Sequence, residues 1–398
     1  MGLTVLYTPP LLCYSKNPII ARIATDSGVG TRMDCIILDN TSGSPVIIGT
    51  VMCYADNDGW YTFKLNKIID SYMNTFDLED PAAAWDDTIL KLQKTAINLI
   101  FSFEEGTGFT TAFARRVIKG GISKISFQRE PEYWTEYFAV NKSWISWLPN
   151  LVKVGKTQPL FLTYNNYNEV VGGKLRVKVY FTDGTFTTVD KAITADIEED
   201  TFYLVKAGYT QLDVGSVDIT KTVYCYEVWM ADSSNAILCA SKKILVAYKY
   251  EPYERFFMYM GSSGNIEVIR TTGKASYKPE ISSSFVDRED QVDINEDNVA
   301  EYVVPVNSNE YDLQKRKTIK LSSGPKTSYE VQLFEDFRIS QWKAEYIPGI
   351  GIIPITIDDK TPDLGKDGDT TNSFAFTYKY AHTENIFTPD NLTRLLGA

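Results

Sequence analysis

The alternation of hydrophobic and polar residues is clearest in the middle of the chain. Residues 174–181 read Lys-Leu-Arg-Val-Lys-Val-Tyr-Phe, so an apolar residue follows a polar one almost throughout. Successive side chains of a β-strand point to opposite faces, and this period of two therefore predicts a strand with one buried face. Asp183-Gly184 is a strong turn signal, and residues 186–189 predict the returning strand of a hairpin.

Similar short strand-like segments occur along the rest of the chain. They lie at 19–23, 33–38, 46–54, 224–230, 237–246, 255–260, 266–271, 317–321, 329–333 and 374–380. Several short strands at a spacing of roughly ten residues are typical of antiparallel sandwiches of the immunoglobulin or fibronectin type. Strands do not alternate with long helices, so a doubly wound parallel sheet is not expected. The predicted fold is mainly β, with chained antiparallel β-sandwich domains and a few short helices.

Three segments of the first 150 residues do not fit a simple strand pattern. Residues 65–72 place apolar side chains at helical spacing and predict a short helix. A second helix is predicted over 89–96, behind Asp86-Asp87 as its cap, with a strand at 96–103 as the alternative. Residues 106–121 contain four glycines and predict a long irregular loop.

The length of 398 residues is too great for one ordinary domain. Changes in pattern divide the chain into three expected domains. Residues 1–150 form a β-rich domain with short helices, 151–250 a β-sandwich, and 251–398 a β-rich domain with acidic loops. We find no convincing internal repeat.

Aromatic residues make up 13% of the chain, which favours sheet and offers broad apolar surfaces for contacts between subunits. Two segments concentrate them. The candidate interface residues are Tyr133, Trp134, Tyr137, Phe138, Trp144 and Trp147 in the first segment, and Phe256, Phe257 and Tyr259 in the second. We predict that they lie at an interface between subunits or between domains. The alternative is that Trp and Tyr rings stack on a bound glycan.

The net charge of −11 opposes binding to phosphate backbones and to anionic membranes, so neither partner is expected. The basic run Lys315–Lys317 is interpreted as a solvated turn or an edge strand. The first ten residues lack a cationic segment and contain Pro9-Pro10, so they do not predict a signal peptide. The five cysteines are scattered and form no Cys-x-x-Cys pair, which predicts buried free thiols in a reducing cytosol.

Candidate chemistry is sparse, and we expect no enzyme, no cofactor and no metal site. The single histidine, His382, has no nucleophile element that would make it part of a triad. Residues 363–369 resemble part of a calcium loop but lack the glutamate that would complete it. Glu104-Glu105 is the one acidic pair beside aromatic residues, and it is interpreted as a solvent-facing loop.

Several short strings give the chain a family resemblance. They are Val117–Ser123, which contains Gly-Gly-Ile-Ser, Trp147–Pro149, Gln158–Leu162, Arg255–Phe257 and Gly261–Gly264. Together they resemble uncharacterised tail or baseplate proteins from phages and prophages of Bacteroides-type bacteria. The resemblance implies a virion structural protein of the tail, baseplate or head-to-tail region, which is made in the host cytoplasm. It also implies docking on other virion proteins and on further copies of the chain in a symmetric oligomer, and it transfers no functional residue.

Two other classes of function stay open at this point. A carbohydrate-binding or receptor-binding module on a virion or cell surface would use the Trp and Tyr rings on a host glycan. A polysaccharide-degrading enzyme would need a carboxylate pair that the fold assembles and the sequence does not reveal. Saturable glycan binding would favour the first, and turnover lost on changing an acid such as Glu104 would favour the second.

Overall fold

A computed structural model gives the fold of the chain. It describes residues 3–25, 31–73, 89–92, 96–105, 109–129, 138, 140–166, 170–193, 196–197, 202–249, 251–287, 292–294, 300–302, 308–348, 350–358 and 373–381. The described residues are mainly β, with several antiparallel sheets and few helices, so the fold class expected from the sequence is confirmed. Within these residues, no helix is long and apolar enough to cross a membrane.

The chain divides into two compact units. Unit 1 contains residues 1–251, 256–270 and 332–351, and unit 2 contains residues 252–255, 271–331 and 352–398. The first two domains expected from the sequence therefore fall in unit 1, which also takes two segments from the third.

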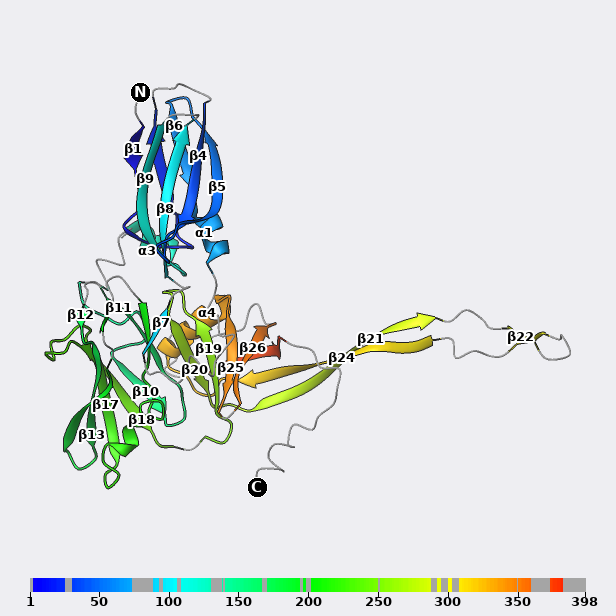
Figure 1. Cartoon of the computed structure of the whole chain (residues 1–398). Helices are drawn as coiled ribbons and strands as arrows, with labels where there is room; N and C mark the ends of the chain where they lie inside the picture. The colour runs from blue at the N-terminus through cyan, green and yellow to red at the C-terminus, as the bar shows by residue number, and fades with distance from the viewer. Residues whose placement is uncertain are drawn as a thin grey trace. The chain divides into compact units, whose positions relative to one another are not determined.

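Unit 1 begins with two sheets around one core (Figure 1). The first sheet has the order β1 (Thr4–Tyr7), β3 (Ile20–Ala24), β6 (Trp60–Lys64). The second has the order β2 (Leu12–Tyr14), β9 (Phe109–Ile118), β8 (Ala96–Glu105), β4 (Arg32–Asp39), β5 (Val46–Tyr54). Alternate residues of β4, among them Met33 and Cys35, are buried and meet Phe63 and Phe101 in the core. The period of two in the sequence therefore marks the face that is buried.

The helix expected at 65–72 is confirmed as α1 (Asn66–Tyr72), and a further short helix, α3 (Lys124–Arg129), follows β9. The loop expected over 106–121 is wrong for residues 109–118, because they form β9 and pair with β8 along its length. The glycines that suggested a loop are at the ends of this segment. The two of them that the structure describes, Gly120 and Gly121, follow the strand rather than interrupt it.

A second pair of sheets in unit 1 encloses a separate core. One has the order β10 (Leu151–Gly155), β18 (Lys242–Ala247), β17 (Val223–Ala231), β13 (Lys174–Phe181), β14 (Phe186–Ile193). The other has the order β11 (Phe161–Asn165), β16 (Phe202–Lys206), β7 (Ile89–Leu92). Shorter elements are β12 (Val170–Val171), paired with β15 (Asp196–Ile197), and the 3-10 helix η2 (Val214–Ser216). The hairpin expected from the Asp183-Gly184 turn is confirmed by the pairing of β13 with β14.

The helix expected at 89–96 is wrong, and its alternative is confirmed. Ile89–Leu92 forms strand β7, which pairs with β16, more than one hundred residues later in the sequence. Ala96 then begins β8. The apolar residues at positions 89, 92 and 96 are spaced as in a helix. The backbone N–H and C=O groups of 89–92 instead pair with β16. The spacing of residues within a short segment cannot predict a strand partner that is distant in the sequence.

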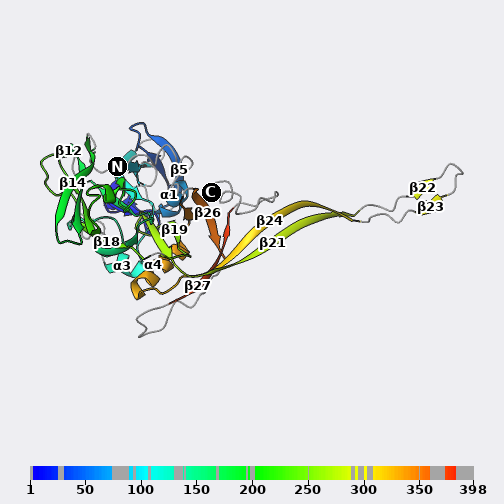
Figure 2. The same ribbon diagram turned by 90° about the horizontal axis from the view of Figure 1, so that it is seen from below.

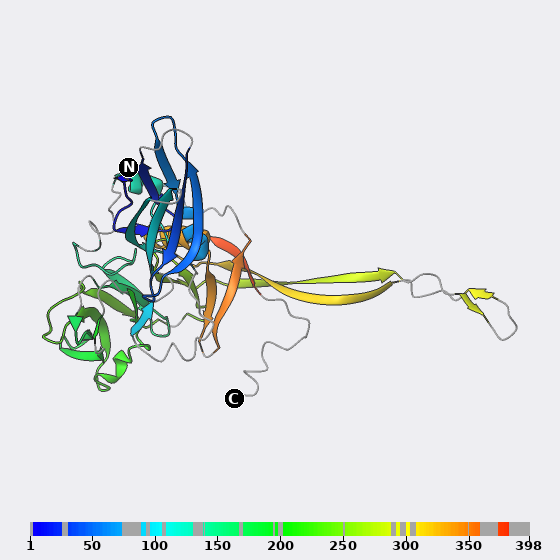
Figure 3. The same cartoon turned by 45° about the horizontal axis from the view of Figure 1, so that its top comes forward.

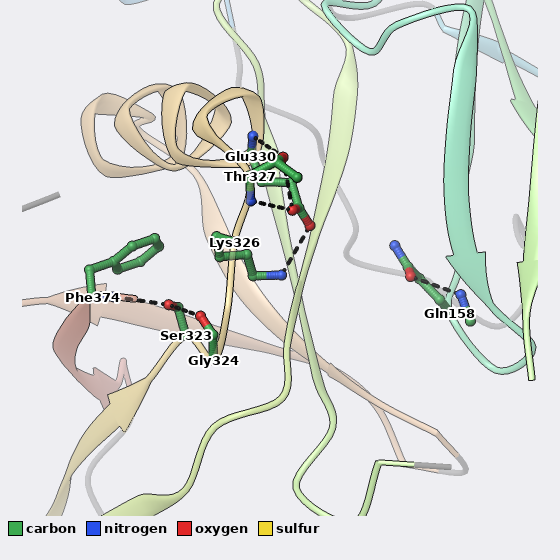
Figure 4. A network of polar contacts seen from close by, with 8 residues as sticks. Gln158, Ser323, Gly324, Lys326, Thr327, Glu330 and Phe374 are labelled. Atoms are coloured by element: carbon green, nitrogen blue, oxygen red, sulfur yellow. Dashed lines mark hydrogen bonds and ion pairs between the residues drawn. The ribbon is translucent and has the colours of Figure 1, made fainter. Parts of the chain in front are cut away.

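The rest of unit 1 contains the neighbouring strands β20 (Ile266–Thr271), β19 (Arg255–Met260) and β25 (Lys343–Ile347), together with most of α4 (Ser328–Ile339). The strand expected at 329–333 is wrong, since these residues lie in α4. Thr327 and Glu330 explain the helix, because the Glu330 carboxylate accepts from the Thr327 N–H at 2.9 Å and the Glu330 N–H donates to Thr327 Oγ1 at 3.3 Å (Figure 4). This reciprocal pair is a capping box.

Unit 2 contains the strand order β26 (Gly351–Ile357), β27 (Ala375–Tyr380), β24 (Ser308–Ser322), β21 (Ala275–Asp287). Between β21 and β24 in the sequence lies a short antiparallel pair, β22 (Val292–Ile294) and β23 (Ala300–Tyr302). The Ser323 hydroxyl accepts from the Phe374 N–H at 3.1 Å, which ties the end of β24 to the start of β27 (Figure 4). Of the acidic loop expected at 287–301, residue 287 ends β21 and residues 292–294 and 300–301 belong to the paired strands β22 and β23, so these residues are not a loop. Its other residues lie outside the described ranges.

The five cysteines are free thiols, as the sequence predicts. Cys13, Cys35, Cys225 and Cys239 are buried, and Cys53 is half-buried. Burial raises the pKa of the Cys13 and Cys35 thiols to about 12, which keeps both protonated and unreactive.

Candidate docking site

The aromatic residues expected at an interface are the first place to look for a docking surface. Tyr133, Trp134 and Tyr137 lie outside the described residues. Phe138 and Trp144 are buried, and Trp147 is half-buried with its ring 6.0 Å from the Phe138 ring. Trp144 packs edge-on against the buried Tyr164, so neither ring of this pair offers an exposed face to a glycan.

Residues beside Trp147 connect this segment to the turn after β19. The Trp147 indole N–H donates to Ser262 Oγ at 3.0 Å, and Ser146 Oγ donates to Glu267 Oε1 at 2.7 Å. Glu267 also accepts from the Asn265 amide, while the Lys242 ammonium donates to the Leu148 carbonyl at 2.9 Å. Because Glu267 and Lys242 are both almost fully buried, this polar group lies inside unit 1.

Burial shifts the pKa values of both charged residues in this group. Burial raises the pKa of Glu267 to about 7, against the opposing charge of Lys242 and hydrogen bonds from Ser146 and Asn265. Burial also lowers the pKa of Lys242 to about 8. Among the described residues, the Glu267 Oε2 atom has no hydrogen-bond partner. Sequence reasoning missed both residues, since a charged residue in an alternating strand gives no sign of its burial.

Phe256, Phe257 and Tyr259 are equally inaccessible. All three are almost fully buried in β19, and the Phe257 and Tyr259 rings lie 5.9 and 5.4 Å from the Phe337 ring of α4. The six candidate side chains that the structure describes thus make contacts within unit 1. Five of these six side chains are buried, and Trp147 is half-buried.

The long hairpin of β21 and β24 in unit 2 is a candidate for a docking surface. The two strands pair from Ala275↔Leu321 to Asp287↔Ser308, which corresponds to roughly 40 Å of extended chain (Figure 2). β27 pairs with β24 only between Thr318 and Ser322. Beyond that point, among the described residues, β21 and β24 continue with no third strand beside them (Figure 3). We call the paired strands β21 and β24 the arm.

Three features of the arm disfavour the non-specific pairing of a strand from another chain with its open edges. Pro279 in β21 lacks the N–H that an added strand would need. The register shifts between Ser282 and Ser284, where β24 carries one extra residue and forms a bulge. Lysine and arginine occupy β24 at 315–317. Such devices are typical of protected sheet edges, so docking should use side chains rather than backbone.

The base of the arm has one face rich in cations. Lys278, Arg316 and Lys320 are exposed, and the register places them on the same face of the sheet. On that face Lys379 of β27 bridges Glu280 and Asp358, at 3.0 and 2.9 Å. These contacts raise the pKa of Lys379, and the Lys379 hydrogen bond lowers that of Glu280.

The opposite face of the base holds an aromatic contact. The Tyr277 hydroxyl accepts from the Arg255 guanidinium at 2.6 Å, and the Lys317 ammonium lies 4.5 Å from the centre of the Tyr277 ring. Tyr277 and Ile281 are still about half or more exposed. This face is therefore amphipathic, whereas the face with Lys278 is mainly charged.

The other residues considered for chemistry are separated or undescribed. His382 and residues 363–369 lie outside the described ranges. Glu104 is exposed on β8, while the adjacent Glu105 is buried and accepts from Tyr61 at 2.9 Å and Thr25 at 2.6 Å. The two carboxylates thus do not form a pair. Among the described residues, no cluster of three His, Cys, Asp or Glu side chains could hold a metal ion.

Comparisons with known proteins give little further guidance. No family model matches the chain, and no curated protein matches it. Solved structures match parts of it, among them the following two. The tail of an empty GTA particle, computed with helical refinement and C6 symmetry, is 16% identical, with 35% of this chain and 99% of that chain covered, at a TM-score of 0.19. The CBD12 domain from CALX1.2 is 4% identical, with 62% and 99% covered, also at 0.19. At these TM-scores neither likeness supports a statement about function.

Proposed function

We propose that this chain is a structural subunit of a phage-type virion, in the tail, baseplate or head-to-tail region, and that it acts by docking on other subunits. The observation that carries the proposal is the arm. An isolated two-stranded hairpin is marginally stable in water. The arm runs for ten residues of β24 past its last neighbouring strand, so contact with another surface would stabilise it.

Two further observations support the proposal. Pro279, the bulge and the cations at 315–317 hinder the addition of a further strand. They suit a surface that has to stay soluble before assembly and bind selectively afterwards. The two pairs of sheets enclose large apolar cores, and burial raises the pKa of the Cys13 and Cys35 thiols, which suits a durable scaffold. The choice of a virion as the assembly rests on the resemblance of the short sequence strings.

The experiment uses a chain with a shortened arm. Residues 281–315 are replaced by Asn-Gly, which joins the register partners Glu280 and Arg316 through a two-residue turn. This change keeps every pair between β24 and β27 and the Glu280–Lys379 ion pair. We expect the full-length chain to be a constant component of particles purified from cells that make them, and the shortened chain to fold but stay out of the particles.

Circular dichroism and thermal melting of the shortened chain provide the folding control. If the full-length chain is absent from purified particles, the proposed function is wrong. If the shortened, folded chain is incorporated as well as the full-length chain, then the arm is not the docking element.

A further inference from the structure

The second sheet of the first sandwich is apolar on both of its faces. Its inner face, with Met33, Cys35 and Phe101, belongs to the core. The register of β4, β5, β8 and β9 places the alternate residues of these strands on the opposite face, which we call the outer face. One row of side chains across the outer face consists of Ala114, Ile100, Leu38 and Ile47.

The apolar side chains of the outer face are accessible. Ile47 is 63% exposed, and Met52 and Tyr54 of the same edge strand are 60% and 64% exposed. Leu38 and Ile100, on the central strands β4 and β8, are half-buried. An antiparallel sheet with one face in water is ordinarily polar on that face. A contiguous apolar surface on it therefore indicates that another surface covers it.

The outer face is also neutral overall. The charged side chains that the structure describes on it are Arg32, Asp34, Glu104 and Arg116, and their charges sum to zero. The Arg32 guanidinium binds the Asp34 carboxylate through two hydrogen bonds, at 2.9 and 2.7 Å. Two copies of a chain with a net charge of −11 repel each other, and the repulsion is smallest where neutral faces meet.

A second copy of the same face has the shape and the size that the outer face needs. Two sheets pack face to face about 10 Å apart, with apolar side chains between them. Four strands are roughly 20 Å wide and the seven steps from Ile47 to Tyr54 are roughly 20 Å long, so the face covers roughly 400 Å². A standard stable interface buries about 800 Å² on each partner, and we therefore expect a reversible contact.

We propose that two copies of this chain pair through the outer face of the first sandwich, about a two-fold axis that sets the same patch on both sides. This inference goes beyond the proposed function, because it concerns strands of unit 1 and not the arm. Salt should strengthen the contact, since screening reduces the repulsion between two chains of like charge and leaves the apolar burial in place. A contact between opposite charges would weaken instead.

The test is sedimentation and light scattering of the purified full-length chain, at low and high salt, up to the highest soluble concentration. Ile47→Lys places an ammonium group in the contact and should raise the Kd of self-association by roughly tenfold or more. Ile219→Lys makes the same change at a side chain that is 86% exposed in a turn outside the outer face, and it should leave the Kd unchanged. Should Ile47→Lys fail to fold by circular dichroism, Met52→Lys replaces it.

A chain that is monomeric at every concentration and salt overturns this inference. Self-association that Ile47→Lys leaves unchanged, or that weakens as salt is raised, overturns it as well. The chain with the shortened arm separates the two proposals, because it keeps the outer face and should self-associate as the natural chain does. If the shortening abolishes self-association, the arm makes the contact, and this inference is wrong while the proposed function gains support. Dimers as expected, from a chain that is absent from purified particles, would overturn the proposed function alone.

Discussion

At the scale of single residues, the buried carboxylate of Glu267 is the most consequential group. It faces the Lys242 ammonium, the Ser146 and Asn265 donors and, farther off, the Asp336 carboxylate. Its pKa rises from the ordinary 4.5 to about 7 because burial disfavours the charged form. Between those two pH values the folded chain keeps a proton that the unfolded chain has released, so the contribution of Glu267 to stability falls as pH rises.

We predict that Glu267→Gln changes the pH dependence of unfolding. The stability of the natural chain relative to the variant should fall between about pH 4.5 and pH 7, by at most about 1.4 kcal/mol per pH unit, and be flat on either side. Urea unfolding at a series of pH values measures this difference. Glu104→Gln, at an exposed position of β8, controls for the loss of one negative charge. Parallel curves for the natural chain and Glu267→Gln would contradict the prediction.

At the scale of elements, α4 shows how a cap can determine what a segment becomes. The sequence 329–333 alternates as a strand would, but Thr327 and Glu330 bind each other's backbone N–H groups. The Lys326 ammonium lies 3.2 Å from the same carboxylate. Although burial acts to raise the pKa of Glu330, the Lys326 charge and the Thr327 N–H outweigh it, and the pKa is lowered. Glu330 is thus charged at the helix start, where the dipole favours an anion.

We predict that Thr327→Ala lowers the free energy of unfolding by about 1 kcal/mol, because the first turn of α4 loses its side-chain acceptor. Urea unfolding followed by circular dichroism measures the change. Gln332→Ala, at an exposed position in the same helix, is the matched control and should change stability by about 0.5 kcal/mol or less. Equal effects of the two substitutions would show that the cap does not stabilise the helix.

At the scale of the whole molecule, the first sandwich of unit 1 contacts the turn after β19 through its backbone. Glycines on both sides allow the two backbones to approach closely. The Gly121 N–H donates to the Ser262 carbonyl at 2.7 Å. A Cβ at Gly264 would lie 2.6 Å from the Lys119 carbonyl oxygen, and one at Gly120 would lie 2.4 Å from the Ser262 carbonyl oxygen. The strings 117–123 and 261–264, which carry part of the family resemblance, therefore meet in space.

We predict that Gly264→Ala destabilises unit 1 by about 2 kcal/mol more than Gly184→Ala does. The two glycines have nearly the same positive φ, +82° and +84°, so the backbone cost of alanine is shared. Only Gly264 has neighbours that a Cβ would strike, whereas Gly184 has no atom within 4 Å. The free energies of unfolding of the two variants measure the difference, and equal values would mean that the turn and the Lys119 backbone do not stabilise each other.

The sequence by itself determined what depends on neighbouring residues. Alternation gave β4 and β13 their buried faces, Asp183-Gly184 gave the hairpin, and the helical spacing of 65–72 gave α1, because each signal lies within one element. The mainly β class followed from the number of such elements.

The tertiary structure decided everything that depends on distant partners. It made Ile89–Leu92 a strand beside β16, buried Glu267 beside Lys242, and enclosed Phe257 and Tyr259 under α4. It also paired β21 with β24, two strands that lie more than twenty residues apart in the sequence, into one arm. Burial, and strand pairing across long stretches of sequence, are set by the whole chain. The local spacing of residues therefore cannot reveal which aromatic residue lies in the core. It also cannot reveal which strand has no neighbour on one side.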